Sequence, residues 1–127
     1  SILGPVRRKT QVELSSSDAF AIGVKPPLRL SGDTDRSATV LLKTPMGRIK
    51  AKMSTIIPIR HLHLPSSMAE SAGVSHHDVV HVRVKGRETI VFEHVVVRVH
   101  PTFTPSFHLT KDEAASVWIQ TGDVVIL

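Results

Sequence analysis

Cysteine is absent from the 127 residues of the sequence. Its absence excludes disulfides, zinc–thiolate sites and a cysteine nucleophile. Any bound metal must therefore be held by nitrogen and oxygen ligands, and the sequence offers eight histidines for that purpose. The absence of cysteine also favours a reducing compartment, so we expect a cytoplasmic protein.

Aromatic residues are scarce, at 4% with no tyrosine, so the base-stacking platforms of single-strand nucleic-acid modules are missing. No apolar run approaches the roughly 18 residues that cross a membrane, and residues 1–9 lack the apolar stretch of a signal peptide. Lys and Arg outnumber Asp and Glu by 16 to 11, a formal net charge of +5. We expect small anionic partners such as phosphate or a phosphate-bearing cofactor, and neither nucleic acid nor a membrane.

Apolar and polar residues alternate through most of the sequence, with many β-branched residues, as in half-buried strands. The pattern predicts strands over 39–42, 49–53, 79–84, 89–92, 95–99 and 124–127. A chain of this length forms one domain or two very small ones. We therefore predict a mainly β fold, either a barrel or two packed barrels, with short helical turns. The loop over 25–35, rich in Pro, Gly, Ser and Asp, is the candidate internal boundary on composition.

An internal repeat is the most informative feature of the sequence. The segments 12–19, 62–69 and 107–114 each begin with an apolar residue, a potential metal ligand, a leucine and a helix-starting residue. Ser15 with Asp18, and Thr110 with Glu113, have the spacing of a capping box, and Pro65 suits the start of a helix. Each copy is predicted to be a strand that turns directly into a short helix. The ligand positions are Glu13, His63 and His108.

His61 and His63 form a His-x-His pair. Side chains two residues apart in a strand point to the same face, so both rings can bind one metal or each can bind one of a pair. Glu13 and His108 would join them if the strand ends converge. Three imidazoles and a carboxylate suit zinc or another first-row divalent ion. The alternative is that the histidines are ordinary residues on the polar face of a strand.

A cationic cluster, Arg7 to Lys9, precedes Glu13. Arginine binds phosphate through a bidentate fork, so the cluster could form an anion pocket beside a metal, or simply a solvated basic end. We expect ordinary, mostly exposed histidines at the five remaining positions, His76, His77, His81, His94 and His100, with His94 at the start of a strand.

Six ordered segments give the sequence a resemblance to the PduL-type phosphotransacylases. It runs from about residue 4 to residue 114, and the segments are 10–15, 18–19, 27–32, 60–64, 94–99 and 108–114. The resemblance implies a mainly β fold of two small β-barrels capped by short helices. On this reading residues 1–127 form the family's phosphotransacylase region, with the barrels joined near 54–60 and the first barrel incomplete.

The resemblance also implies reversible transfer of a propanoyl or acetyl group between coenzyme A and inorganic phosphate, assisted by two metal ions, typically zinc. The substrates and products would be acyl-CoA, phosphate and acyl phosphate. Glu13 resembles the carboxylate ligand of one metal, and His61, His63 and His108 resemble the imidazole ligands, mainly of the other. Arg7 resembles the phosphate-binding arginine of the family.

An earlier His-x-His segment of the family has no counterpart in this sequence. Three alternatives stay open: the chain is a fragment, a second polypeptide completes the site, or a single metal is kept. We expect a homo-oligomer, and the resemblance adds a bacterial microcompartment as an alternative location. The alternative function is a non-catalytic β-barrel fragment that binds a metal or an anion. Because the sequence has no cysteine and no serine plainly paired with a base, we expect direct attack in a ternary complex.

Overall fold

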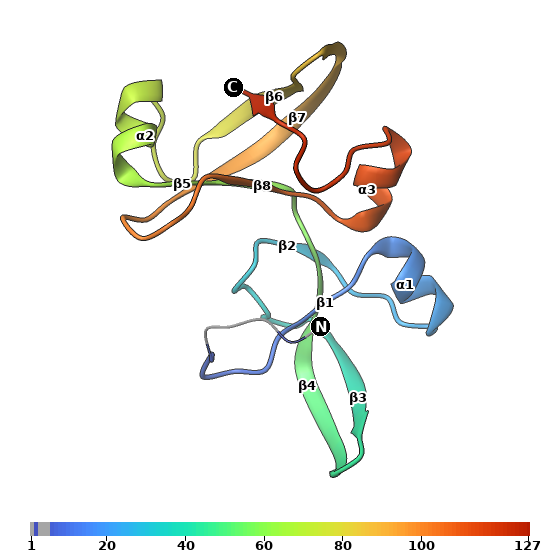
Figure 1. The fold of residues 1–127 in the computed structure, drawn as a ribbon. Helices are drawn as coiled ribbons and strands as arrows, with labels where there is room; N and C mark the ends of the chain where they lie inside the picture. The colour runs from blue at the N-terminus through green and yellow to red at the C-terminus, as the bar shows by residue number, and fades with distance from the viewer. Residues whose placement is uncertain (1, 3–5) are drawn as a thin grey trace. The chain divides into compact units, whose positions relative to one another are not determined.

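Two compact units, Ser1–Pro58 and Ile59–Leu127, make up the chain in a computed structural model that describes residues 2 and 6–127. The division between the units lies within the range 54–60. The prediction of a boundary at 25–35 is wrong, because strand β2 (Leu28–Arg29) forms inside this loop and pairs with the last strand of the same unit. Each unit is mainly β with short helices, as predicted (Figure 1).

The first unit is organised by β4 (Gly47–Pro58), which forms an antiparallel hairpin with β3 (Ala38–Thr44). Two short strands, β1 (Val12–Glu13) and β2, add to β4 in parallel. Helix α1 (Ser16–Ala21) lies between β1 and β2 in the sequence. Among the described residues of this unit, the buried apolar side chains are Ala19, Val40, Ala51 and Ile56.

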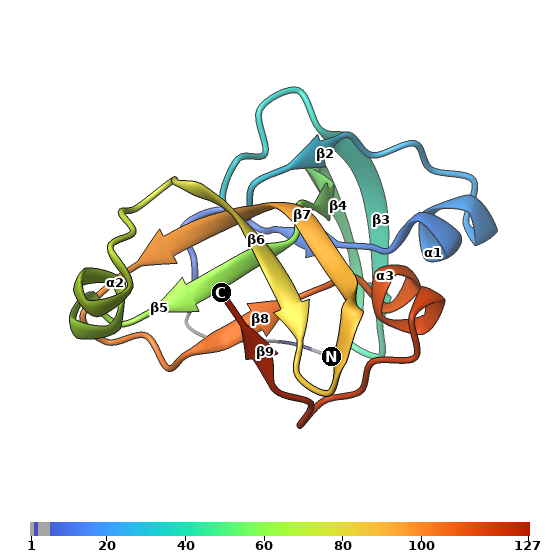
Figure 2. The ribbon, with the colours of Figure 1, turned by 90° about the horizontal axis from the view of Figure 1, so that it is seen from above.

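The second unit is one five-stranded sheet in the order β8-β5-β7-β6-β9, curled into a half-barrel (Figure 2). Its elements, with their bounds, are β5 (His61–Leu64), α2 (Ser66–Ala72), β6 (Val79–Val84), β7 (Arg87–Val99), β8 (Ser106–His108), α3 (Lys111–Ser116) and β9 (Val125–Ile126). Strand β5 pairs in parallel with β7 and antiparallel with β8. It therefore lies inside the sheet, with a neighbour along each edge.

The core of the second unit follows from strand alternation. One face of β6 contributes Val82 and Val84, and the same face of β7 contributes Val95 and Val97, all at most 1% exposed. Leu62 and Leu64 of β5 belong to the same cluster, whose buried residues are Leu62, Leu64, Ala69, Val82, Val84, Phe92, Val95 and Val97. Burial of β-branched side chains on one face is what makes these segments strands.

Strand β7 runs without interruption where two strands, 89–92 and 95–99, were predicted. The register against β6 shifts between Val80 and Val82, so Glu93 and His94 bulge out opposite a single residue. His94 takes a positive φ of 54° within this bulge. The prediction that His94 begins a strand is wrong, because the bulge accommodates the extra residue and β7 continues on both sides of it.

The three repeat copies fold as predicted, each from a strand into a short helix. Ser15 is the N-cap of α1 and accepts a hydrogen bond from the Asp18 backbone nitrogen. Thr110 and Glu113 form a complete capping box at the start of α3, and Pro65 is the N-cap of α2. The candidate ligand of each copy thus lies two residues before a helix N-cap. Within residues 2 and 6–127 the structure contains no helix long and apolar enough to cross a membrane.

Candidate metal centre

The three predicted site histidines converge at one end of the β5–β8 ladder. His61 and His63 lie on β5, and His108 is the last residue of β8, directly opposite His61 in the antiparallel register. One ligand nitrogen from each of the three residues lies within 4.8 Å of the other two. Strand pairing therefore brings together residues that are more than 40 positions apart in the sequence.

The rings form a compact cluster. The His61 and His108 rings are stacked, with centroids 4.8 Å apart and an interplanar angle of 5°. The His63 ring is tilted against both, at 4.9 Å from His61 and 4.4 Å from His108. Three imidazoles at these separations would repel one another if more than one carried a proton charge, so the cluster favours neutral rings.

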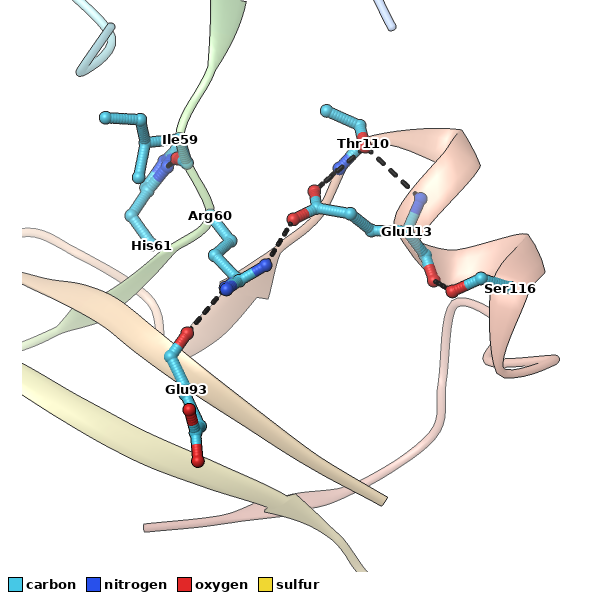
Figure 3. Close-up of polar contacts among 7 residues, drawn as sticks. All are labelled: Ile59, Arg60, His61, Glu93, Thr110, Glu113 and Ser116. Carbon is cyan, nitrogen blue, oxygen red and sulfur yellow. Dashed lines mark hydrogen bonds and ion pairs between the residues drawn. The ribbon is translucent and has the colours of Figure 1, made fainter. Parts of the chain in front are cut away.

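Hydrogen bonds fix the tautomers of His61 and His108. The His61 Nδ1 lies 2.8 Å from the Ile59 carbonyl, an acceptor, so Nδ1 carries the proton and Nε2 holds the lone pair (Figure 3). The Ser106 hydroxyl donates to the Thr104 carbonyl at 3.1 Å, so it accepts from His108 Nε2 at 3.0 Å, and the lone pair of that ring is on Nδ1. A backbone or hydroxyl partner on the second nitrogen is the usual arrangement for a metal-binding histidine.

His63 is partly buried, whereas His61 is buried and His108 is exposed. The Nε2 atom of His63 is buried and has no hydrogen-bond partner among the described residues. Burial, followed by the charges of His108, His61 and Arg98, lowers the pKa of His63 from 6.5 to about 4. The Phe103 ring stacks on it with centroids 4.1 Å apart and an angle of 17°. At neutral pH this ring is neutral, which is the form that binds a metal.

The donor set fits a first-row divalent ion. Two nitrogens bound at about 2.05 Å to a tetrahedral zinc ion lie about 3.4 Å apart, so small ring rotations would close the observed spacing of 4.8 Å or less. The unsatisfied Nε2 of His63 supports the same conclusion, because a buried polar atom without a partner is costly unless a ligand completes it. Three neutral imidazoles suit zinc, copper, iron or nickel and disfavour calcium or magnesium.

The other two predicted site residues, Glu13 and Arg7, belong to the first unit. Glu13 ends β1 and is exposed. Its Oε1 accepts a hydrogen bond of 2.7 Å from Gln11 Nε2, and Arg7 Nη2 donates to the Ser31 hydroxyl at 3.4 Å. Within residues 2 and 6–127, only His61, His63 and His108 lie close enough together to hold a metal ion as a group of three.

Gln11 connects Glu13 with the turn that contacts Arg7. Its Nε2 also donates to Ser31 Oγ at 3.0 Å, and its Oε1 accepts from the Gly32 backbone nitrogen at 2.8 Å. A Cβ on Gly32 would lie 3.7 Å from Arg7 Nη1, so the turn approaches the guanidinium closely. Sequence reasoning assigned no role to Gln11. The sequence pattern that could have indicated a role is the position of Gln11 two residues before Glu13, because side chains two apart in an extended segment point to the same side.

The remaining histidines lie outside the cluster, and all five are exposed, as expected for His76, His77, His81 and His100. His76 and His77 contact each other with ring centroids 3.9 Å apart, and His76 Nδ1 accepts from the Val99 backbone nitrogen at 3.0 Å. Burial, followed by the charges of His77 and Arg98, lowers the pKa of His76. No third candidate ligand joins this pair among the described residues.

Comparison with known proteins gives a consistent result. A family model described as phosphate propanoyltransferase matches residues 1–120. The chain is 40% identical over 127 residues to the phosphate propanoyltransferase of Thermotoga maritima, covering 99% of the chain and 60% of that protein. It is 38% identical over 121 residues to the phosphate propanoyltransferase of Listeria monocytogenes, covering 95% of the chain and 57% of that protein. The chain thus spans about 60% of the length of these relatives.

Proposed function

The chain belongs to the phosphate propanoyltransferase family, and from this premise we propose that it carries the reaction machinery of a metal-dependent phosphate acyltransferase. The reaction would move a short acyl group, propanoyl or acetyl, between coenzyme A and inorganic phosphate. The observation that carries the proposal is the convergence of His61, His63 and His108 within 4.8 Å in a chain that matches this family.

We propose that His61, His63 and His108 bind one divalent ion, zinc, and that Glu13 is the carboxylate ligand of a second. Two features support the first assignment: the ring of His63 is neutral, and His61 donates from Nδ1 to the Ile59 carbonyl, which leaves the lone pair on Nε2, where it can bind a metal. The exposed carboxylate of Glu13, oriented by Gln11, supports the second. When bound, zinc supplies Lewis-acid polarisation of an oxygen and offsets the negative charge of phosphate.

Arg7 is proposed to bind the phosphate. One guanidinium nitrogen donates to Ser31, which orients the planar group, and a guanidinium offers five donors in a fork that matches phosphate oxygens. Held in this way, a phosphate oxygen attacks the thioester carbonyl carbon of acyl-CoA. A carbon–oxygen bond forms, the carbon–sulfur bond breaks, and the proton of hydrogenphosphate ends on the coenzyme A sulfur.

Transfer is proposed to be direct, without an acyl-enzyme. The sequence contains no cysteine, and the hydroxyl of Ser106, which contacts a candidate ligand, donates to the Thr104 carbonyl and accepts from His108. A serine that accepts a hydrogen bond from histidine is oriented opposite to a nucleophile, which must donate its hydroxyl proton to a base. Sequential initial-rate patterns with varied acyl-CoA and phosphate are expected, and ping-pong patterns would contradict direct transfer.

The main experiment combines elemental analysis with an assay of phosphate-dependent release of coenzyme A from propanoyl-CoA and acetyl-CoA. We expect the purified chain to contain zinc, and His63→Ala and His108→Ala to lose zinc and turnover together. His81→Ala, an exposed histidine on β6 outside the cluster, serves as the control and should keep both. Zinc binding without turnover would support the alternative of a non-catalytic metal-binding fragment, and a chain without zinc would contradict the metal assignment.

The remaining parts of the proposal rest on the resemblance. They are the use of two ions, completion of the site by an upstream segment or a second polypeptide, a homo-oligomeric state, and a location in the cytoplasm or inside a bacterial microcompartment. Size-exclusion chromatography with light scattering would test the oligomeric state.

A further inference from the structure

Arg60 forms a hydrogen-bonded tie immediately before the first histidine of the cluster. Its Nη1 pairs with Glu113 Oε1 at 3.0 Å, and its Nε donates to the Glu93 carbonyl at 2.7 Å (Figure 3). The side chains of Arg60 and Glu113 are 31% and 25% exposed, so the pair is mostly shielded from water. Such a pair is better ordered than a fully exposed ion pair.

The carboxylate of Glu113 is held on its other side by the capping box of α3. Oε2 accepts from the Thr110 backbone nitrogen at 2.9 Å and from the Thr110 hydroxyl at 2.8 Å. The position of the carboxylate is therefore coupled to the backbone of Thr110, two residues after His108. The guanidinium belongs to Arg60, the residue directly before His61. The Arg60–Glu113 pair thus links the backbone just before His61 to the backbone just after His108.

Backbone pairing stops where this tie begins. The β5–β8 ladder runs from His63 opposite Ser106 to His61 opposite His108, which is its final rung. Beyond that rung the chain leaves β8 for α3, and the Arg60–Glu113 pair joins the two sides there. The last residue pair of a β-ladder opens readily unless a contact beyond it holds the two strands together.

The second contact of the Arg60 side chain depends on the bulge in β7. Glu93 lies in the bulge opposite β6, and its carbonyl accepts from Arg60. The guanidinium therefore connects β7, one sheet neighbour of β5, with α3, the helix that follows the other neighbour, β8. A lysine could bind only one of these partners well, because its single ammonium lacks the planar fork of arginine.

We propose that Arg60 and Glu113 are positioning residues of the metal centre, which set the separation and ring orientation of His108 relative to His61. The inference rests on the proposed function, since it presupposes that these histidines bind an ion. Neither residue is proposed to contact the ion or the substrates. Removing an outer partner of a metal ligand typically lowers metal affinity by about 10- to 100-fold, and we expect about tenfold for this indirect tie.

A second arginine provides a matched control. Arg87 Nη2 pairs with Asp123 at 3.1 Å, and Nη1 donates to the carbonyls of Val117 and Trp118. These side chains are 39% and 35% exposed, close to the values for the first pair. Arg87→Gln therefore removes a comparable ion pair and comparable carbonyl contacts from the same unit, away from the histidines.

The test compares Arg60→Gln, Glu113→Gln, the double variant and Arg87→Gln in the 127-residue chain. Zinc affinity is measured by competition with a chromophoric chelator, and ligand geometry by the visible absorption of bound Co²⁺. We expect both single variants to lose about tenfold in zinc affinity and to change the cobalt spectrum, with no further loss in the double variant. Arg87→Gln should keep the zinc affinity and spectrum of the parent chain, whatever its thermal stability.

Several outcomes would overturn the inference. Arg60→Gln with the parent affinity and spectrum, a loss equal to that of Arg87→Gln, or additive losses in the double variant would each remove the positioning role while the metal site stands. A parent chain that binds neither zinc nor cobalt would overturn the proposed function and this inference together. If Arg60→Gln does not fold, Arg60→Lys decides: a partial loss of affinity supports the role, and parent affinity refutes it.

Discussion

Substitution of Gln11 tests whether its amide holds Glu13 and the Ser31–Gly32 turn in one arrangement. The alanine variant removes all three hydrogen bonds of the side chain. The glutamate variant keeps an oxygen to accept from the Gly32 nitrogen but loses both donations of Nε2. It also places a second carboxylate at the Glu13 contact, which is 2.7 Å long.

The two variants differ in size of effect and in pH dependence. Because the network is largely exposed, we take the low end, about 0.5 kcal/mol per hydrogen bond, so Gln11→Ala should lower the unfolding free energy of the first unit by about 1.5 kcal/mol. Gln11→Glu loses about 1 kcal/mol in the same way. Repulsion between two carboxylates at this distance in water adds about 1.5 kcal/mol, for a total of about 2.5 kcal/mol at neutral pH.

Protonation reverses the order of stability. In acid the introduced carboxyl of Gln11→Glu binds a proton, which removes the repulsion and restores a donor. The glutamate variant should then be more stable than the alanine variant, whereas at pH 7 it is less stable. High salt should narrow the difference at pH 7, because exposed charges are screened.

Native-state amide hydrogen exchange measures these changes residue by residue. Leu14 and Ile57 donate their amides to Ile56 and Pro27, so they report opening of the first unit. Their exchange should be about tenfold faster in Gln11→Ala, and faster still in Gln11→Glu at pH 7. The Gly32 amide should lose protection in the alanine variant and keep more of it in the glutamate variant. Equal exchange in both variants at every pH would refute the reasoning.

Two further predictions concern the second unit. Val97 is fully buried, so Val97→Ala should lower the free energy of unfolding in urea by about 2 kcal/mol through lost burial and a residual cavity. Val91 lies on the same strand but is 44% exposed, so Val91→Ala should lower it by less than about 0.5 kcal/mol. Similar losses in the two variants would contradict the assigned core. In metal-free protein, the pKa of His63 is lowered to about 4, so between about pH 4 and 6.5 the unfolded chain binds more protons than the folded chain. The stability due to this ring is therefore complete above about pH 6.5 and falls as the pH is lowered through that window. His63→Gln should flatten the pH dependence of the melting temperature, and an unchanged slope would count against the shift.

Local sequence signals predicted the strand-to-helix units. Ser15, Pro65 and Thr110 are all N-caps, because capping depends on residues within one helical turn. The alternation of valines likewise predicted β6 over 79–84, its observed bounds. By contrast, the bulge at Glu93 and His94 had no signal, since a positive φ at a non-glycine residue depends on the pairing of the whole strand.

Convergence of the histidines could be predicted because equivalent repeat positions imply equivalent strand ends. The hydrogen-bond networks around them could not. Gln11 with Ser31, and Arg60 with Glu113, join residues 20 and 53 positions apart. Their contacts depend on loop and helix placement that no local pattern encodes. The sequence therefore predicted one role of Glu113, in the capping box, but not the other, as the ion-pair partner of Arg60.

Strand β5 alternates His61 and His63 with the core residues Leu62 and Leu64, which are 5% and 3% exposed. Four consecutive residues thus contribute alternately to the core and to the candidate metal centre. A change in the packing beneath the strand must shift the imidazoles above it, since one backbone carries both. Sequence variation in this protein should therefore spare β5 and accumulate in segments that hold no candidate ligand, such as the exposed turn of the β3–β4 hairpin.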